Sequence, residues 1–210
     1  MISLLAILVF AQASPADRAI DAAVKAYQGI RTATATFEQS IRNPLLGSTL
    51  QSRGEFEQAR PNRFVFRFSE PAGDIIVCDG RNVWVYLPTS APGQVSRAPC
   101  VSDQAGSLDL IGEFFLNPRT RYSIGDGGSA TLGDRRVQVV LLTPKDRSAA
   151  FVRAKVWIDP SDGSLAQFEA EEPNGLVRLV RITSFTPNAA VRPDAFTFKV
   201  PKGVRVVDVK

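Results

Sequence analysis

Histidine is missing from all 210 residues of the sequence, and cysteine occurs only twice, as Cys78 and Cys100. Without histidine the chain cannot build a serine–histidine or cysteine–histidine catalytic pair, a histidine proton relay or a histidine-ligated metal site. Two cysteines without further ligands of this kind do not make a zinc site. We therefore expect no catalytic residue, no metal, no cofactor and no enzymatic activity; a lipid hydrolase, for example, would lack an activated nucleophile.

The sequence also has no large excess of positive or negative residues. The 25 Lys and Arg residues stand against 21 Asp and Glu, which gives a net charge of +4. The basic residues alternate with acidic ones and form no cluster that could follow a phosphate backbone. We expect no nucleic-acid partner, and a length of 210 residues fits one soluble domain, because single domains commonly run to ~150–250 residues.

The first ten residues are apolar apart from Ser3, and the small-x-small triplet Ala11-Gln12-Ala13 follows them. This pattern predicts a secretory signal peptide over residues 1–13 and a single mature domain over 14–210. The apolar run is shorter than the ~20 residues needed to span a bilayer. A buried first helix is the alternative interpretation.

Export would place the two cysteines in a compartment that permits disulfides. If Cys78 and Cys100 lie on the first and third strands of a meander, the strand spacing of ~4.8 Å separates them by roughly 10 Å. That distance exceeds the reach of a disulfide unless the chain changes its path. The pairing therefore stays open.

One amphipathic helix is predicted directly after residue 13. Ser14 is placed to cap it, Pro15 fits its first position, and Asp17 fits a capping box. Apolar residues then recur at three- and four-residue spacing, at Ile20, Ala23, Val24, Tyr27 and Ile30.

From Thr32 the hydrophobic period becomes two, which predicts an antiparallel sheet of about ten short strands. Further strands are predicted over residues 54–57, 63–69, 75–79, 82–87, 151–158, 165–171, 176–183 and 196–200. We interpret 88–99 as a loop and 125–128 as a turn. Residues 107–116, hereafter the lid, form a predicted amphipathic helix with Phe114 and Phe115 on its apolar side.

These elements predict a mainly β protein with helices (α+β): a strongly curved antiparallel half-barrel sheet, covered by the lid, around a hydrophobic cavity. Phe64, Phe66 and Phe68 alternate on one strand, and Trp84 and Tyr86 alternate on another. Such aromatics fill an ordinary core or line a ligand cavity, and composition alone does not decide between the two.

Several motifs in fixed order resemble the periplasmic outer-membrane lipoprotein carrier family, LolA. They are Phe37-Glu38-Gln39, Gly54-Glu55-Phe56, Arg-Pro-x-x-Phe at 60–64, Asp79-Gly80, Trp84-Val85-Tyr86, Leu-Thr-Pro-Lys at 142–145 and Phe-Thr-Phe at 196–198. The resemblance covers most of the mature chain.

The resemblance implies a non-enzymatic carrier in the periplasm of a Gram-negative type of bacterium. Such a protein takes acylated lipoproteins from an ATP-driven release complex in the inner membrane and passes them to an outer-membrane receptor. Arg60 matches the family's lid latch, a side chain that holds the lid closed, and Phe64 matches an aromatic at the cavity. By strand parity we add Phe66, Trp84 and Tyr86 to the cavity lining, and Phe114 and Phe115 to the underside of the lid. We expect a monomer.

Two other functions use the same fold. An outer-membrane receptor is disfavoured because no cysteine for lipid attachment follows the apolar run. A periplasmic lipid- or glycolipid-binding module, or a lipoprotein sensor, remains the alternative function, because a shared fold does not determine the ligand.

Overall fold

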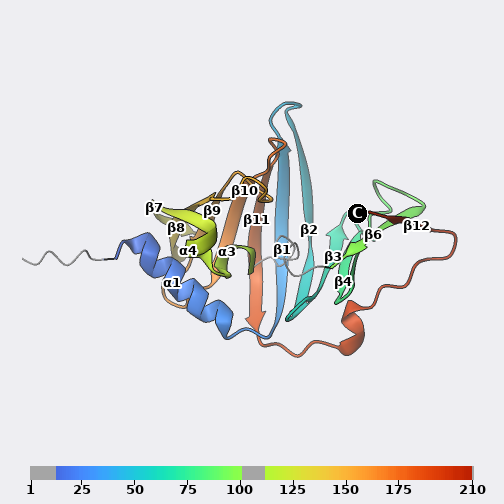
Figure 1. Cartoon of the computed structure of the whole chain (residues 1–210), viewed down its shortest axis with the longest axis horizontal. Coiled ribbons are helices and arrows are strands. Elements are labelled where there is room, and N and C mark those ends of the chain that lie inside the picture. The colour runs from blue at the N-terminus through green and yellow to red at the C-terminus, as the bar shows by residue number, and fades with distance from the viewer. Residues whose placement is uncertain (1–12, 101–111, 210) are drawn as a thin grey trace, which may run out of the picture.

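The computed structural model describes residues 13–100 and 112–209. It is built on one twelve-stranded sheet with strand order β12-β6-β5-β4-β3-β2-β1-β11-β10-β9-β8-β7 (Figure 1). The strands are β1 (Thr32–Asn43), β2 (Ser48–Ala59), β3 (Arg63–Glu70), β4 (Ile75–Asp79), β5 (Asn82–Tyr86), β6 (Gln94–Pro99), β7 (Tyr122–Leu132), β8 (Arg135–Pro144), β9 (Arg153–Ile158), β10 (Leu165–Glu171), β11 (Val177–Pro187) and β12 (Arg205–Asp208).

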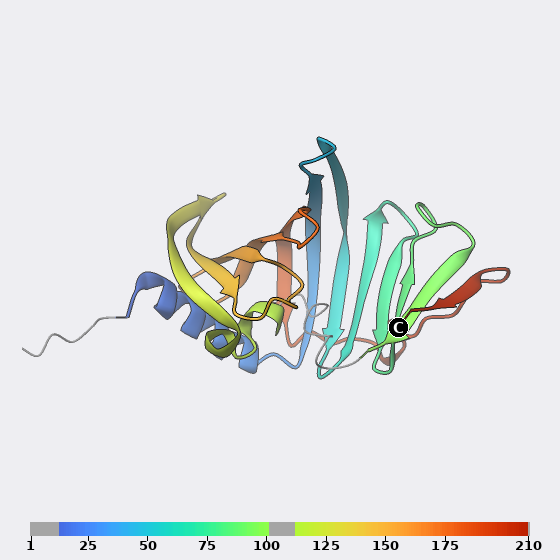
Figure 2. The same ribbon diagram turned by 45° about the horizontal axis from the view of Figure 1, so that its top comes forward.

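All neighbouring strands pair antiparallel except β12 and β6, which pair parallel. The sheet is open and strongly curved (Figure 2). The prediction of a mainly β protein with a curved antiparallel sheet is confirmed.

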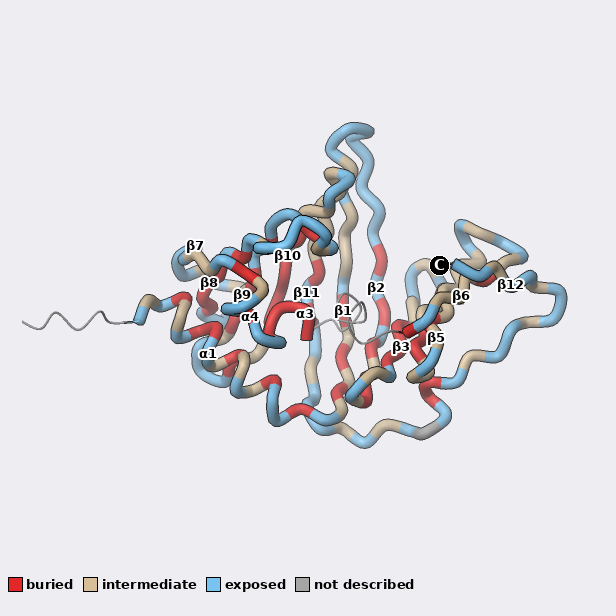
Figure 3. Tube along the Cα trace, in the orientation of Figure 1, coloured by how far each residue is buried: buried red, intermediate tan, exposed pale blue. Residues whose placement is uncertain are grey.

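The two faces of the sheet carry separate apolar clusters. The inner face, which holds Phe37, Phe66 and Phe168, packs against the helices α1 (Pro15–Gln28) and α3 (Gly112–Phe115). The outer face holds Val65 and Val77 and packs against Phe196 of the 3-10 helix η1 (Pro193–Phe196). In Figure 3, buried residues recur along α1, cover α3 and lie in the half of β1 and β2 away from the hairpin tip.

Helix α1 begins where the sequence predicts. The Ser14 side chain accepts a hydrogen bond from the Asp17 backbone N–H at 3.0 Å, and Pro15 occupies the first turn. Ile20, Ala23 and Tyr27 are buried against the inner face, where α1 contacts β7, β8 and β9. Burial of this apolar stripe stabilises the helix more than local propensity does.

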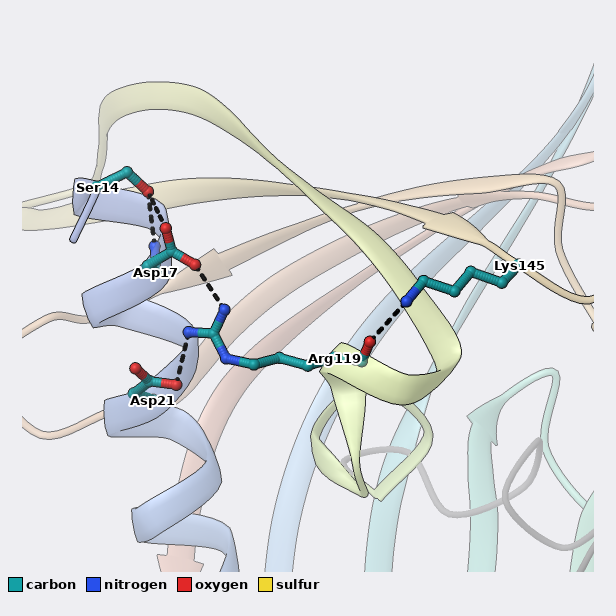
Figure 4. A network of polar contacts seen from close by, with 5 residues as sticks. All are labelled: Ser14, Asp17, Asp21, Arg119 and Lys145. Carbon is teal, nitrogen blue, oxygen red and sulfur yellow. Dashed lines mark hydrogen bonds and ion pairs between the residues drawn. The ribbon is translucent and has the colours of Figure 1, made fainter. Parts of the chain in front are cut away.

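Ion pairs also join α1 to the short helix α4 (Pro118–Arg121). Arg119 contacts Asp17 at 2.7 Å and Asp21 at 2.9 Å, and its backbone oxygen accepts a hydrogen bond from Lys145 at 2.8 Å (Figure 4). Because α4 follows α3 closely along the chain, the ion pairs of Arg119 also connect α3 to α1.

Three local predictions are wrong. Residues 125–128 lie within β7, not in a turn, and the β7–β8 register shifts between Asp126 and Ser129. A Cβ at Gly127 would lie 2.9 Å from Val139 Cγ1, and Gly128 has a φ of +82°, so this bulge requires glycine. Residues 196–200 contain the end of η1 and no strand, and 94–99 of the predicted loop form β6.

Part of the predicted lid is described. Its last residues form α3, whereas 101–111 lie outside the described residues. The predicted signal peptide also lies there, apart from Ala13. Within the described ranges, no helix is long and apolar enough to cross a membrane.

Candidate lipid-binding site

An apolar pocket of about 410 Å³ lies between α3 and the inner face of the sheet. Six phenylalanines contribute to its wall, and five of them come from β1, β3, β10 and α3. Its lining residues are Phe37, Gln39, Phe66, Phe68, Ile76, Glu113, Phe114, Ala150, Phe151, Phe168, Ala170, Glu172, Arg178 and Val180. A concave apolar site with few polar groups at its edge suits an aliphatic ligand.

Helix α3 supplies the wall of this pocket opposite the sheet. Phe114 and Phe115 are both 2% exposed, and the Phe114 ring lies 5.0 Å from Phe168 and 5.8 Å from Phe151. Phe114 lines the pocket, whereas Phe115 faces a second one, described below. The two predicted lid residues are thus on the underside of α3, toward the sheet.

A buried carboxylate holds α3 in place. Glu113 is 8% exposed, and its Oε1 accepts hydrogen bonds from Arg121 at 2.7 Å and from the Tyr122 hydroxyl at 2.9 Å. Burial and then the charge of Glu113 raise the pKa of Tyr122 well above its ordinary value. The phenol therefore stays protonated and donates to Glu113 throughout the physiological pH range.

Polar groups gather at one edge of the pocket. Arg178 on β11 donates to Glu172 at 2.8 Å and to the Gln39 side-chain oxygen at 2.9 Å. Gln39 in turn donates to the Ser52 hydroxyl at 2.9 Å. This network is half-buried, so it presents charged and amide groups beside the aliphatic surface.

The second pocket, of about 490 Å³, lies under the C-terminal half of α1. It is lined by Ala23, Ala26, Tyr27, Gly29, Ile30, Phe115, Arg135, Asp162, Gly163, Ser164, Leu165, Ile182, Phe185, Pro187 and Asn188. Phe115 of α3 therefore borders this pocket, while its neighbour Phe114 borders the first. A shift of α3 would change the shape of both pockets.

Arg60 lies at the C-terminal end of α1. Its guanidinium donates to the backbone oxygens of Tyr27 and Ile30, each at 3.2 Å, and lies 4.3 Å from the centre of the Tyr27 ring. The side chain also borders a groove that includes Phe115 and Leu116. Contacts of Arg60 with residues 107–111 of the predicted lid lie outside the described residues.

Phe64 and Phe66 both lie on the inner face, but in different surroundings. Phe66 lines the first pocket. Phe64 is 3% exposed, packs 5.8 Å from the Phe66 ring and belongs to the core beneath the pocket. Within the described residues, Phe64 supports the wall and is not part of its lining.

The placement of Trp84 and Tyr86 in the cavity is wrong. Trp84 pairs with Val77 and Tyr86 pairs with Ile75, and these partners belong to the outer face. Both rings pack on Phe198, at 5.5 and 5.9 Å, and Trp84 Nε1 donates to Asp79. The C-terminal segment covers these aromatics, a long-range contact that strand parity could not reveal.

Cys78 and Cys100 form a disulfide with a Cα–Cα distance of 6.3 Å. Cys78 lies on β4, whereas Cys100 follows the end of β6 and donates its backbone N–H to the backbone oxygen of Arg81 in the β4–β5 turn. The chain thus leaves the sheet at Pro99 and approaches β4, which is the change of path that bonding requires. The bond holds the start of the segment that leads to the lid.

Several pocket residues are missing from the sequence-based prediction. Phe37, Phe151 and Phe168 line the first pocket, as do Gln39 and Arg178. Phe37 and Phe168 alternate with polar neighbours on their strands, so the sequence indicated that each lies on the apolar face of its strand. Nothing in the sequence showed that β1 and β10 would face the same pocket.

Comparison with known proteins gives concordant matches. Residues 28–105 match the family model described as "Outer membrane lipoprotein carrier protein LolA". A protein of Haemophilus ducreyi named outer-membrane lipoprotein carrier protein is 30% identical over 176 residues, which cover 83% of this chain and 78% of that protein. A protein of Methylibium petroleiphilum with the same name is 30% identical over 211 residues, covering 97% and 96%.

The fold also occurs among solved structures. An uncharacterized conserved protein from Thermus thermophilus matches with a TM-score of 0.58 at 14% identity, covering 93% of this chain and all (100%) of that chain.

Proposed function

Because the chain belongs to the outer-membrane lipoprotein carrier family LolA, we propose that it is a periplasmic chaperone that binds the acyl chains of lipoproteins and carries them between membranes. It receives its cargo from an ATP-driven release complex in the inner membrane and passes it to a receptor in the outer membrane. The protein reaches the periplasm through the signal peptide over residues 1–13 and acts there as a monomer, without catalysis.

The observation that supports this function most directly is the aromatic pocket between α3 and the sheet. Each methylene group that leaves water for an apolar site contributes ~0.8 kcal/mol. Partial burial of several acyl chains therefore holds a lipoprotein in solution without a covalent bond. Weak, non-directional contacts also permit transfer to a receptor.

The same proposal keeps Arg60 as the lid latch. Its contacts with the end of α1 and its position beside Phe115 and Leu116 place a charged fork next to the residues that end the lid. Arriving acyl chains displace α3, and this strains the contacts of Arg60. The latch thereby couples cavity opening to cargo.

A release assay tests the carrier function. The purified protein is added to spheroplasts that contain the cognate release complex and synthesise a tagged lipoprotein, and the soluble fraction is analysed for a 1:1 complex. Two variants place the same charge on opposite faces of the sheet. Phe68→Glu alters a half-buried residue of the pocket wall, and Tyr86→Glu alters a half-buried residue of the outer face.

We expect release by the unmodified protein and by Tyr86→Glu, and loss of release by Phe68→Glu with an unchanged circular dichroism spectrum. Absence of release by the folded, unmodified protein would contradict the carrier function and favour the lipid-binding or sensing module. Equal release by both variants would show that the pocket is not the binding site.

A further inference from the structure

The β1–β2 hairpin carries an apolar tip that the carrier function does not explain. Leu45 is 88% exposed, Leu46 is 77% exposed, and Leu50 nearby is 60% exposed. Single exposed leucines are ordinary on protein surfaces, but three in one hairpin form a patch that needs a partner. The hairpin extends beyond the neighbouring strands, and its end is exposed (Figures 1 and 3).

The conformation of the turn presents these leucines to solvent. The Asn43 side-chain oxygen accepts hydrogen bonds from the backbone N–H groups of Leu45 and Leu46, at 3.0 and 3.2 Å. Gly47 has a φ of +64°, which returns the chain into β2. These contacts fix the backbone of a turn in which both leucine side chains are exposed.

The charged residues of the hairpin itself are of one sign. From Gln39 to Gly54 the sequence contains Arg42 and Arg53 and no carboxylate. Arg53 pairs with Glu70, whereas Arg42 is exposed and has no ion pair within the described residues. An apolar end with a free cation at its base complements a phospholipid surface, where the hydrocarbon lies below a layer of phosphate groups.

The inner side of the hairpin is continuous with the first pocket. Phe37 and Gln39 line that pocket, and Ile41 is the next residue of β1 on the same face. Leu50 lies directly opposite Ile41 in the β1–β2 register. Ile41 and Leu50 therefore lie between the polar edge of the pocket, at Gln39, and the leucines of the tip.

We propose that the β1–β2 hairpin inserts Leu45 and Leu46 into the surface of a phospholipid bilayer and thereby directs the edge of the pocket toward the membrane. A narrow convex tip offers little area to a folded protein, since stable protein interfaces bury ~800 Å² on each partner. A fluid bilayer needs no matching groove. Insertion is shallow and reversible, as suits a protein that must also leave the membrane.

The test uses vesicles of phosphatidylethanolamine and phosphatidylglycerol that contain no protein. The purified chain is floated with them on a density gradient, and the Leu45→Ser/Leu46→Ser variant is compared with Val209→Ser. Val209 is 49% exposed but lies next to β12, far along the sequence from the hairpin. We expect flotation of the unmodified protein and of Val209→Ser, and an at least tenfold weaker vesicle affinity for the double variant.

A second measurement reports the position of the tip. Brominated phospholipids should quench the added fluorescence of a Leu46→Trp variant and leave that of Val209→Trp unchanged. Arg42→Gln should weaken binding to vesicles with phosphatidylglycerol and leave binding to vesicles without it unchanged.

Absence of vesicle binding by the unmodified protein, or equal binding by the double variant, would overturn the proposal. So would binding only to vesicles that contain envelope proteins, because the partner would then be a protein. The carrier function is tested separately. Phe68→Glu should still float with vesicles, and Leu45→Ser/Leu46→Ser should still form the soluble lipoprotein complex.

Discussion

The Arg60 guanidinium lies 4.3 Å from the centre of the Tyr27 ring and donates to the Tyr27 backbone oxygen at 3.2 Å. One side chain at the end of β2 thus contacts both the ring and the main chain at the end of α1. A bond from the same nitrogen to Ile30 adds a further backbone acceptor. Arginine suits this position because its planar fork bonds several oxygens and stacks on a ring at once.

Replacement of Arg60 by leucine should destabilise the fold by about 2 kcal/mol, because charge-assisted hydrogen bonds and the ring contact are lost together. For a chain of this length we expect a melting temperature lower by roughly 4–8 °C. Arg31→Leu is the control, since Arg31 is exposed and only its backbone forms hydrogen bonds within the described residues. Scanning calorimetry of both variants measures the difference.

The proposed latch function of Arg60 predicts a kinetic effect in addition. If Arg60 holds the lid closed as proposed, a fluorescent fatty acid should enter Arg60→Leu faster than the unmodified protein. Stopped-flow fluorescence measures the entry rate. An unchanged rate in a variant that is less stable would show that Arg60 only fixes the end of α1.

Reduction of the Cys78–Cys100 disulfide should also destabilise the protein. The bond joins residues 22 positions apart. A loop of this size restricts the unfolded chain enough to contribute about 3 kcal/mol. Urea unfolding with and without dithiothreitol measures this contribution.

The matched control for reduction is Cys78→Ala/Cys100→Ala. This variant should unfold at the lower urea concentration under both conditions, because it has no bond to reduce. An effect of dithiothreitol on the variant as large as on the unmodified protein would refute the assignment.

Elements with local signals were predictable from the sequence. Ser14, Pro15 and Asp17 determine the start of α1 through contacts within one helical turn. The two-residue period identified most strands, and the number of strands relative to helices indicated the curved sheet. Local chemistry was also sufficient to place Phe114 and Phe115 on the side of α3 that faces the sheet.

Features that depend on pairing between distant segments were not predictable. The face occupied by Trp84 follows from its register with Val77 and from the cover supplied by Phe198. Residues 196–200 alternate like a strand, but this segment packs on the outer face and forms no ladder. A one-residue change of register moves every side chain of a strand to the opposite face.

The outer-face position of Trp84 gives a direct prediction. Trp84→Ala should lose the packing on Phe198 and the bond to Asp79, and so lower stability by about 2–3 kcal/mol. The affinity of the protein for a hydrophobic dye should not change, because Trp84 does not border either pocket on the inner face. Phe66→Ala, which alters the pocket wall, should change that affinity. A weaker dye affinity of Trp84→Ala at full folding would contradict the assignment.

Acid should loosen the contact between α1 and α4. Hydrogen bonds from Arg119 and then from Ser14 hold the pKa of Asp17 below its ordinary value of 3.8. Because the folded pKa is depressed, the stabilisation is fully present above the unfolded pKa and is lost as the pH falls through the folded pKa. The relevant window therefore lies below about pH 4.

The Asp17→Asn variant should melt at a lower temperature than the unmodified protein from about pH 5 to pH 8, and the difference should shrink below about pH 4. The effect is small, since the carboxylate is about one-third exposed and solvent screens the ion pair. Asp134→Asn removes an exposed carboxylate without an ion-pair partner in the described residues, and it serves as the control. Melting curves over this pH range measure both differences. The difference in melting temperature between Asp17→Asn and the unmodified protein could instead stay constant into the acid range. The stabilisation would then come from the hydrogen-bond geometry of the helix cap, and the charge on Asp17 would contribute nothing.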